Sequence, residues 1–228
     1  MTDGSGPVVA AFRDEVAAFR AALCSLSTPL WNRPTRCAPW QVRDVVGHVI
    51  TVLARVPDMV AASAPPEPDT DPITYYRADA RFSETVNAER VRSARSRAMA
   101  SDTAGLVNDL ADVAQEVVAR CAGQPADRVV RTRHGDAMLL SNFLLTRLFE
   151  TAVHGIDVAD AVDQPAWLTA PAADHLGRMI FGTNRRTAIS MLGGDVVIAL
   201  CKATGRAPVT DDELALLNAW GAHRLALR

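Results

Sequence analysis

The chain has 228 residues, of which 49% are hydrophobic and 22% charged, and its formal net charge at pH 7 is -2. A chain of this length can bury a full hydrophobic core, while its balanced charge argues against a nucleic-acid-binding surface and against a disordered chain. Its four cysteines form no Cys-x-x-Cys pair, so we expect neither a disulfide framework nor a thiolate zinc knuckle.

The first residues, Met1 to Pro7, lack the basic region and apolar core of a signal peptide. No apolar run approaches the roughly 20 residues that a membrane span requires. We therefore expect a cytoplasmic protein with reduced thiols and with no nucleic-acid or membrane partner, and the sequence leaves a homodimer open. The basic residues are arginines except Lys202, which is typical of a GC-rich bacterial genome.

Two helices are predicted in the first quarter of the chain. Apolar side chains at spacings of three and four predict an amphipathic helix from roughly Pro7 to Leu26. A second helix should begin after Pro39 and run to about Arg55, with His48 in its middle. Residues 57–73 hold five prolines, which predicts an exposed connector that could border a site.

The next segment, from Tyr75 to Ala100, is polar and rich in arginine. We interpret it as a solvated helical face, and the alternative is a patch that binds an anionic ligand. The arginines concerned are Arg77, Arg81, Arg90, Arg92, Arg95 and Arg97.

Beyond this segment the pattern predicts two helices separated by a short extended arm. Asp102 is expected to cap a helix that ends near Gly123. Residues 129–133 read as an extended arm followed by a turn, after which Ser141 could cap a long helix. His134 lies in that turn among turn-forming neighbours, and we interpret it as an exposed loop histidine and not as a ligand.

The C-terminal quarter is also predicted to be helical. Thr169 and Pro171 should start a helix that runs to about Leu192, where two glycines break it. A short helix should follow over 195–204, and Thr210 begins a capping box for a last helix. We predict an all-α protein in which residues 1–163 form a metal-binding four-helix bundle and residues 164–228 form a helical extension packed on it.

One helical face carries the candidate chemistry. Arg147, Glu150, His154 and Asp157 follow one another at spacings of three or four, so they lie on one side of the long helix. Glu150 and His154 could bind one ion, and His48 could add a third ligand from a neighbouring helix. Two histidines, one carboxylate and an open fourth position are typical of a catalytic zinc site, although nickel suits the same ligands.

Each assignment has an alternative without metal chemistry. A Glu four residues before a His is common by chance and could be a surface pair, but the apolar residues around Glu150 and His154 favour a packed helix. Asp44, one turn before His48, could accept a ring N–H or could be an acid that favours a helix N-terminus. Arg147 could hold an anionic substrate or form a surface ion pair.

Two segments resemble the signatures of a known family. Residues 37–48, Cys-Ala-Pro-Trp-Gln-Val-Arg-Asp-Val-Val-Gly-His, and residues 150–157, Glu-Thr-Ala-Val-His-Gly-Ile-Asp, are similar to the two motifs of the mycothiol-dependent maleylpyruvate isomerase family within the DinB-like superfamily. The resemblance covers roughly residues 8–163. It implies a four-helix bundle that holds a divalent metal, usually zinc, at His48, Glu150 and His154, with mycothiol, a thiol of actinobacteria, as cosubstrate. We assign Arg147 and Asp157 to cofactor binding.

The resemblance further implies an S-transferase or isomerase acting on an electrophilic unsaturated small molecule. Residues 165–228 do not resemble the sterol-carrier-like second domain of the isomerase, although residues 204–206, Thr-Gly-Arg, match a short motif common in the family. This departure leaves the substrate open. Two alternatives remain: a thiol-independent tailoring enzyme of secondary metabolism on the same bundle, and a non-catalytic metal or small-molecule binding protein.

Overall fold

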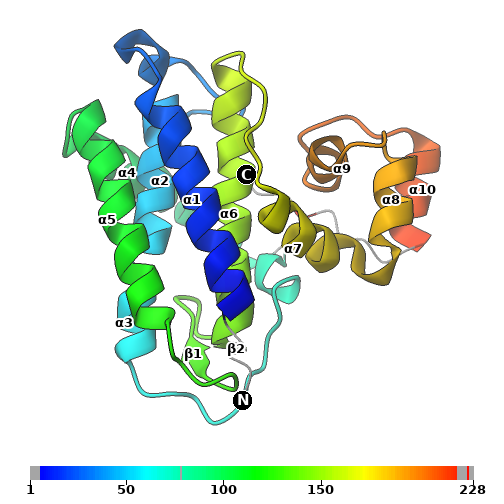
Figure 1. Cartoon of the computed structure of the whole chain (residues 1–228), viewed down its shortest axis with the longest axis horizontal. Helices are drawn as coiled ribbons and strands as arrows, with labels where there is room; N and C mark the ends of the chain where they lie inside the picture. Colours follow the sequence, from blue (N-terminus) through cyan, green and yellow to red (C-terminus); the bar gives the residue numbers. More distant parts are fainter. Residues whose placement is uncertain (1–5, 78, 220–224, 226–228) are drawn as a thin grey trace.

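Four helices form the centre of the computed structural model, which describes residues 6–77, 79–219 and 225. The helices are α1 (Gly6–Cys24), α2 (Val42–Leu53), α5 (Thr103–Cys121) and α6 (Leu140–Ala161). Both α1 and α2 pack against α5 and α6, so the four surround one core (Figure 1). The predicted all-α fold is confirmed.

Local signals account for the ends and faces of these helices. In α1 the predicted periodic residues Phe12, Val16 and Phe19 are buried. At the start of α5 the Asp102 carboxylate accepts a hydrogen bond from the Gly105 backbone N–H at 2.8 Å, as the capping pattern predicts. Sequence and fold therefore agree where the signal is local.

A short helix, α3 (Val56–Ala61), follows α2 almost at once. The prediction that the connector begins at residue 57 is therefore wrong. Pro57 lies in the first turn of α3, where the absent N–H would have had no partner within the helix. The rest of the connector reaches the bundle's lower end, where Asp69 exchanges hydrogen bonds with the backbone of Ala137.

The arginine-rich segment forms two short 3-10 turns, η2 (Thr74–Tyr76) and η3 (Ala80–Phe82), and then α4 (Glu84–Met99). Helix α4 packs against α2. A Cβ atom on Gly47 would lie 2.5 Å from the Ala94 carbonyl oxygen, so the glycine permits this close approach. The segment is thus held against the helix that carries His48.

An antiparallel hairpin precedes α6. Its strands are β1 (Val129–Arg131) and β2 (Ala137–Leu139), with Val130 opposite Met138. Strand β2 leads directly into α6, whose first residue Leu140 donates its N–H to the Arg128 carbonyl at 2.8 Å. The prediction that Ser141 caps this helix is wrong, because Leu139 stands at the N-cap position and makes no side-chain cap.

The C-terminal helices form a lobe beside the bundle (Figure 1). They are α7 (Ala170–Phe181), the turn η4 (Gly182–Asn184), α8 (Arg185–Met191), α9 (Val196–Ala203) and α10 (Asp211–Ala219). Helix α7 packs on α1 and α6, and α8 and α9 pack on α7. The predicted unbroken helix to Leu192 is wrong because Gly182, at φ 56°, ends α7. The division into residues 1–163 and 164–228 stays a prediction.

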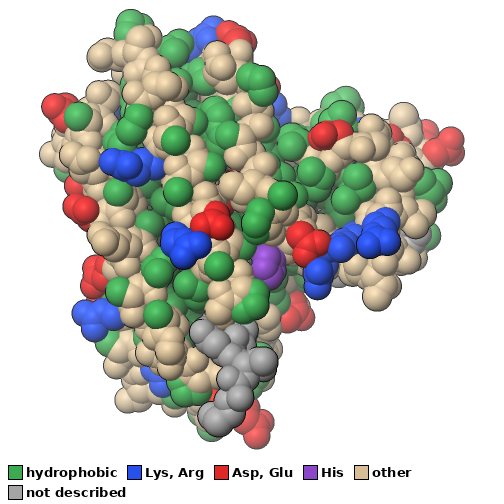
Figure 2. Space-filling view, in the orientation of Figure 1, with side chains coloured by type: hydrophobic (Ala, Val, Ile, Leu, Met, Phe, Trp, Pro, Cys, Tyr) green, Lys and Arg blue, Asp and Glu red, His purple; other side chains and the backbone are tan. Residues whose placement is uncertain are grey.

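The surface shows no segregation of charge on the face seen in Figure 2, where acidic and basic side chains are mixed over both the bundle and the lobe. Among the helices of the described residues, none combines the length and the apolar character that crossing a bilayer demands.

A buried carboxylate joins the bundle to the lobe. Glu15 on α1 is 1% exposed, and its Oε2 accepts hydrogen bonds from the Thr169 backbone N–H at 2.9 Å and from its hydroxyl at 2.6 Å. Burial raises the pKa of Glu15, and the two hydrogen bonds offset this rise only in part. The folded protein therefore holds the Glu15 proton more readily than the unfolded chain does.

The substitution Glu15→Gln is expected to raise the free energy of unfolding at pH 8. A raised folded-state pKa means that Glu15 contributes stability below its unfolded pKa and loses this contribution as pH rises through the folded value. Glutamine stays neutral and keeps an oxygen for both Thr169 donors. Urea unfolding at pH 8 and pH 4 measures the difference, which should shrink at the lower pH. A variant less stable than the wild type at pH 8 would contradict this account.

Candidate metal centre and arginine pocket

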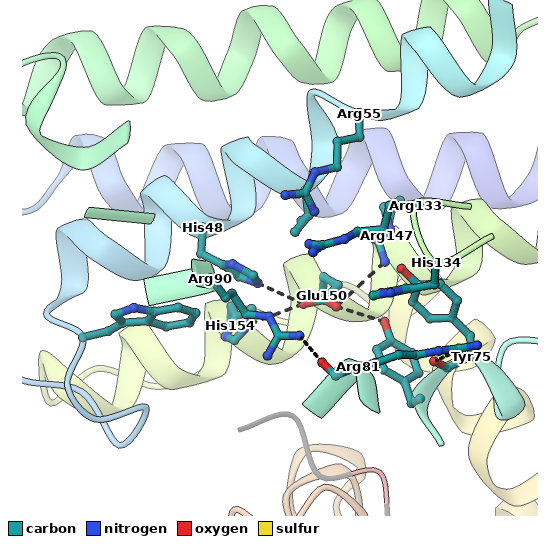
Figure 3. Close-up of a pocket in the computed structure, with 13 residues that line it drawn as sticks. His48, Arg55, Tyr75, Arg81, Arg90, Arg133, His134, Arg147, Glu150 and His154 are labelled. Carbon is teal, nitrogen blue, oxygen red and sulfur yellow. Dashed lines mark hydrogen bonds and ion pairs between the residues drawn. The ribbon is translucent and has the colours of Figure 1, made fainter. Parts of the chain in front are cut away.

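Three of the predicted site residues meet inside the bundle. Glu150 and His154 project from the buried face of α6, and His48 faces them from α2 (Figure 3). Glu150 Oε2 lies 3.5 Å from His48 Nε2 and 3.3 Å from His154 Nε2. The ligand atoms of all three lie within 4.8 Å of one another.

These distances fit a shared divalent ion. With ligand bonds of about 2.0–2.2 Å, two ligand atoms on one tetrahedral ion lie about 3.3–3.6 Å apart. Glu150 Oε2 is a buried atom that receives no hydrogen bond from the described residues, so an oxygen with high affinity for cations is left without a donor. The residues present therefore suit the metal that the motifs imply.

Electrostatics prepare two of the ligands for this role. Burial lowers the pKa of His48 to about 4, so its imidazole is neutral at pH 7. Burial alone would raise the pKa of Glu150, but the nearby His154 and His48 rings and the charge of Arg147 lower it well below its usual value. A neutral imidazole and an ionised carboxylate are the forms that bind a metal.

Asp157 lies behind His154, outside the pocket wall. Its Oδ2 is 3.0 Å from His154 Nδ1, and its side chain is fully buried. Burial opposes a charge on His154, but hydrogen bonds to Asp157, Cys37 and Glu150 raise its pKa well above the ordinary value. Asp157 thus holds the Nδ1 side of the His154 ring, and Nε2 points toward Glu150.

Asp44 does not support His48 in the corresponding way. Its Oδ2 accepts the Gln41 backbone N–H at 3.0 Å in a capping box at the start of α2, and no hydrogen bond joins it to His48 in the described part of the chain. Of the two interpretations, the helix N-terminal acid is the correct one. The Trp40 ring instead covers His48, with ring centroids 4.8 Å apart.

Tyr76 is a site residue that the sequence did not single out. Its hydroxyl lies 3.2 Å from Glu150 Oε1 and 3.0 Å from the Thr146 carbonyl oxygen. Burial, and then the charge of Glu150, raises the pKa of Tyr76 well above its ordinary value, so the hydroxyl stays protonated. Tyr76 therefore occupies one oxygen of Glu150 and leaves the other to face the histidines.

His48, Glu150 and His154 form one end of a pocket. The volume of this pocket is about 560 Å³ when the part open to solvent is included. Five arginines from separate elements line the same pocket (Figure 3). They are Arg55, Arg81, Arg90, Arg133 and Arg147. Positive charge thus collects beside the candidate metal centre, where a bound anion would be attracted.

Two of these arginines show that the positive charge is incompletely balanced. Arg147 is 3% exposed, its Nη2 lies 3.8 Å from Glu150 Oε1, and this nitrogen makes no hydrogen bond with the described residues. The surface ion pair considered for Arg147 is therefore wrong. Burial and then the charges of Arg133 and Arg147 lower the pKa of Arg55 to about 10. An anionic ligand would relieve this repulsion.

The structure also corrects two predictions about exposed residues. Arg81, 8% exposed, and Arg90 line the pocket, so the interpretation of residues 75–100 as a solvated face is wrong for these two. His134 lies on the pocket wall with its ring centroid 5.6 Å from that of Tyr75, and it is not an exposed loop residue. Burial and neighbouring arginines lower its pKa to about 4. The location of His134 on the pocket wall depends on where the hairpin packs, and the local sequence carries no signal for that.

Solved structures and curated proteins resemble the chain. Crystal structures of a mycothiol-dependent maleylpyruvate isomerase and of its His-to-Ala mutant align with TM-scores of 0.53 and 0.55. Each alignment covers 86% of this chain and 77% of the isomerase chain, at 13% sequence identity. This likeness shows a shared fold. An uncharacterised protein of Mycobacterium tuberculosis, from two strains, is 28% identical over 195 residues, covering 75% of this chain. The match spans only 63% of the length of that relative.

A family model for the mycothiol maleylpyruvate isomerase N-terminal domain matches residues 11–159. The match includes α2 and α5 and most of α1 and α6, ends just beyond Asp157, and contains His48, Glu150 and His154. It therefore spans well over half of the chain, including both of its signature segments. The chain belongs to the family of the mycothiol maleylpyruvate isomerase N-terminal domain.

Proposed function

We propose that this protein is a metal-dependent enzyme that uses a low-molecular-weight thiol, mycothiol, in S-transfer to or cis–trans isomerisation of an anionic unsaturated electrophile. One observation carries the proposal. The open side of the His48, Glu150 and His154 cluster faces a pocket whose walls hold five arginines. A thiol at the metal and an anionic substrate against the arginines would then be held side by side.

The chain's own residues would prepare the metal site. His48, Glu150 and His154 would hold the ion, Tyr76 would fix one oxygen of Glu150, and Asp157 would fix the ring of His154. A bound zinc ion lowers the pKa of a thiol that coordinates it, so the thiolate is available at neutral pH. Burial of the three ligands would keep bulk water away from them.

The arginines would orient the substrate. A carboxylate can accept two parallel hydrogen bonds from one guanidinium group, which sets its direction as well as its position. In an isomerisation the thiolate sulfur would add to one carbon of the double bond, and the π electron pair would move onto the carbonyl group conjugated with it. After rotation about the resulting single bond, the electron pair would re-form the double bond and the sulfur would leave as the thiolate. In a transfer the carbon–sulfur bond would be kept, and the proton given up by the thiol would be balanced by one taken up from solvent at the other carbon of the former double bond. Arg147 is held over the Phe143 ring at 4.9 Å, its Nη2 lies 3.8 Å from Glu150 Oε1, and it is the first candidate for this contact.

The proposal predicts thiol chemistry that depends on metal and persists below the thiol's own pKa. With mycothiol and a panel of unsaturated acids and epoxides, the rate should remain substantial below the free thiol pKa of about 8.5. Removing the metal with a chelator should abolish turnover, and added zinc should restore it. The measurement is the rate of thiol-dependent turnover from pH 6 to pH 10, with metal content determined on the same untreated protein.

The same experiment separates the alternatives. A rate that follows the free thiolate fraction into the alkaline range and survives the chelator would show that the protein does not activate the thiol. Turnover of an electrophile without any thiol would favour a tailoring enzyme. Stoichiometric metal without turnover of any tested compound would favour a binding protein.

A further inference from the structure

Arg206 reaches the metal centre from the C-terminal lobe. It follows α9, in the Thr-Gly-Arg segment, and its guanidinium group binds both oxygens of Asp157. Arg206 Nε lies 2.8 Å from Asp157 Oδ1, and Nη2 lies 2.8 Å from Oδ2. Two parallel charge-assisted hydrogen bonds of this kind fix a carboxylate in direction as well as in place.

The pair is buried and held from several sides. Asp157 is fully buried, and the Arg206 side chain is 4% exposed. Arg206 Nη1 also lies 3.3 Å from the Thr204 carbonyl oxygen, and the Arg36 side chain binds the carbonyl oxygen of Arg206. The lobe's contact with Asp157 is therefore a fixed part of the structure and not a surface ion pair, whose contribution to stability is small.

The contact continues to a proposed ligand. Asp157 Oδ2, which receives Arg206 Nη2, is also the oxygen 3.0 Å from His154 Nδ1. Because Arg206 binds both oxygens, rotation of the carboxylate would break at least one of these bonds. Arg206, Asp157 and His154 thus form a chain of hydrogen bonds that begins in the lobe and ends at Nε2, which faces Glu150.

We propose that Arg206 is a positioning residue through which the C-terminal lobe sets the metal affinity of the bundle. The inference rests on the proposed metal site. Groups that orient a ligating histidine through its second nitrogen contribute about 10- to 100-fold in metal affinity. Arg206 acts one step further out, by holding the carboxylate that orients His154.

The test is zinc affinity, measured on the full chain by competition with a chromogenic chelator at pH 7.5. Arg206→Ala should raise the zinc Kd by about tenfold or more. Arg206→Lys should lie between it and the wild type, because an ammonium group cannot reproduce the planar two-point contact. The matched control is Lys202→Ala, which breaks the Lys202–Glu213 ion pair within the lobe and should leave the Kd unchanged.

A double-mutant cycle with Asp157→Asn distinguishes positioning from a general structural role. If Arg206 acts through Asp157, its replacement should change the zinc Kd by less than about threefold in the Asp157→Asn background. The cycle is measured with Arg206→Lys as well. The lysine variant provides the test if far-UV circular dichroism shows that the alanine variant is unfolded.

Two results would overturn the inference alone. The first is a zinc Kd equal to that of the wild type in the folded Arg206→Ala and Arg206→Lys variants. The second is a change in zinc Kd on replacing Arg206 that has the same factor in the wild-type and the Asp157→Asn backgrounds. A wild-type protein that binds no zinc would overturn the proposed metal site together with this inference.

Discussion

Replacing His154 with alanine is expected to abolish zinc retention and thiol-dependent turnover while leaving the helical content largely intact. His154 offers one of the three converging ligand atoms. Residues that only orient a metal ligand contribute about 10- to 100-fold in metal affinity, so the loss of a ligand itself should weaken zinc binding by more than this. The fold should survive because Asp157 keeps its bonds to Arg206 and Glu150 keeps its contacts to His48 and Arg147. Metal analysis, turnover and far-UV circular dichroism check the three parts.

His175→Ala is the matched control for this prediction. His175 lies on α7, outside the pocket, so its replacement should change neither metal content nor turnover. Full activity in the His154→Ala variant would exclude a ligand role for His154. Complete unfolding would show that His154 is better described as structural.

The second large effect is expected at Arg55, where replacement by methionine should weaken anion binding without destabilising the fold. A hydrogen bond to a charged group contributes about 1.5–3 kcal/mol, so the KM for an anionic electrophile should rise about 10- to 150-fold. The empty protein should be as stable as the wild type or more stable, because the substitution relieves repulsion from Arg133 and Arg147. Steady-state kinetics and thermal unfolding measure the two effects.

The comparison that isolates charge uses a neutral ester of the same electrophile. Its KM should change little in Arg55→Met, since the ester has no anionic group for the guanidinium to bind at that position. Arg120→Met serves as the control variant, because Arg120 is an exposed residue of α5 paired with Glu116 at 3.6 Å. A uniform rise in KM for acid and ester would show that Arg55 shapes the pocket and does not bind the anion.

The sequence by itself determined those features that depend on neighbours along the chain. The period of α6 alone places Glu150 and His154 on one face, and Asp157 one turn on, because residues three and four apart are adjacent on any helix. The caps at Asp102 and Thr210 were likewise readable, since a cap is a contact over three residues. The family was recognisable for the same reason, as its motifs are short and continuous.

The tertiary structure alone decided which residues complete the site. Arg55 follows α2, Arg81 lies in a turn, Arg90 on α4 and Arg133 in the hairpin, and these segments meet only after the helices have packed. Arg81 and Arg90, which the polar pattern assigns to solvent, line the pocket, because composition does not record which side of a segment is covered. The link from Arg206 to Asp157 joins positions 49 residues apart, a separation at which packing of the lobe on the bundle, and not local pattern, brings side chains into contact.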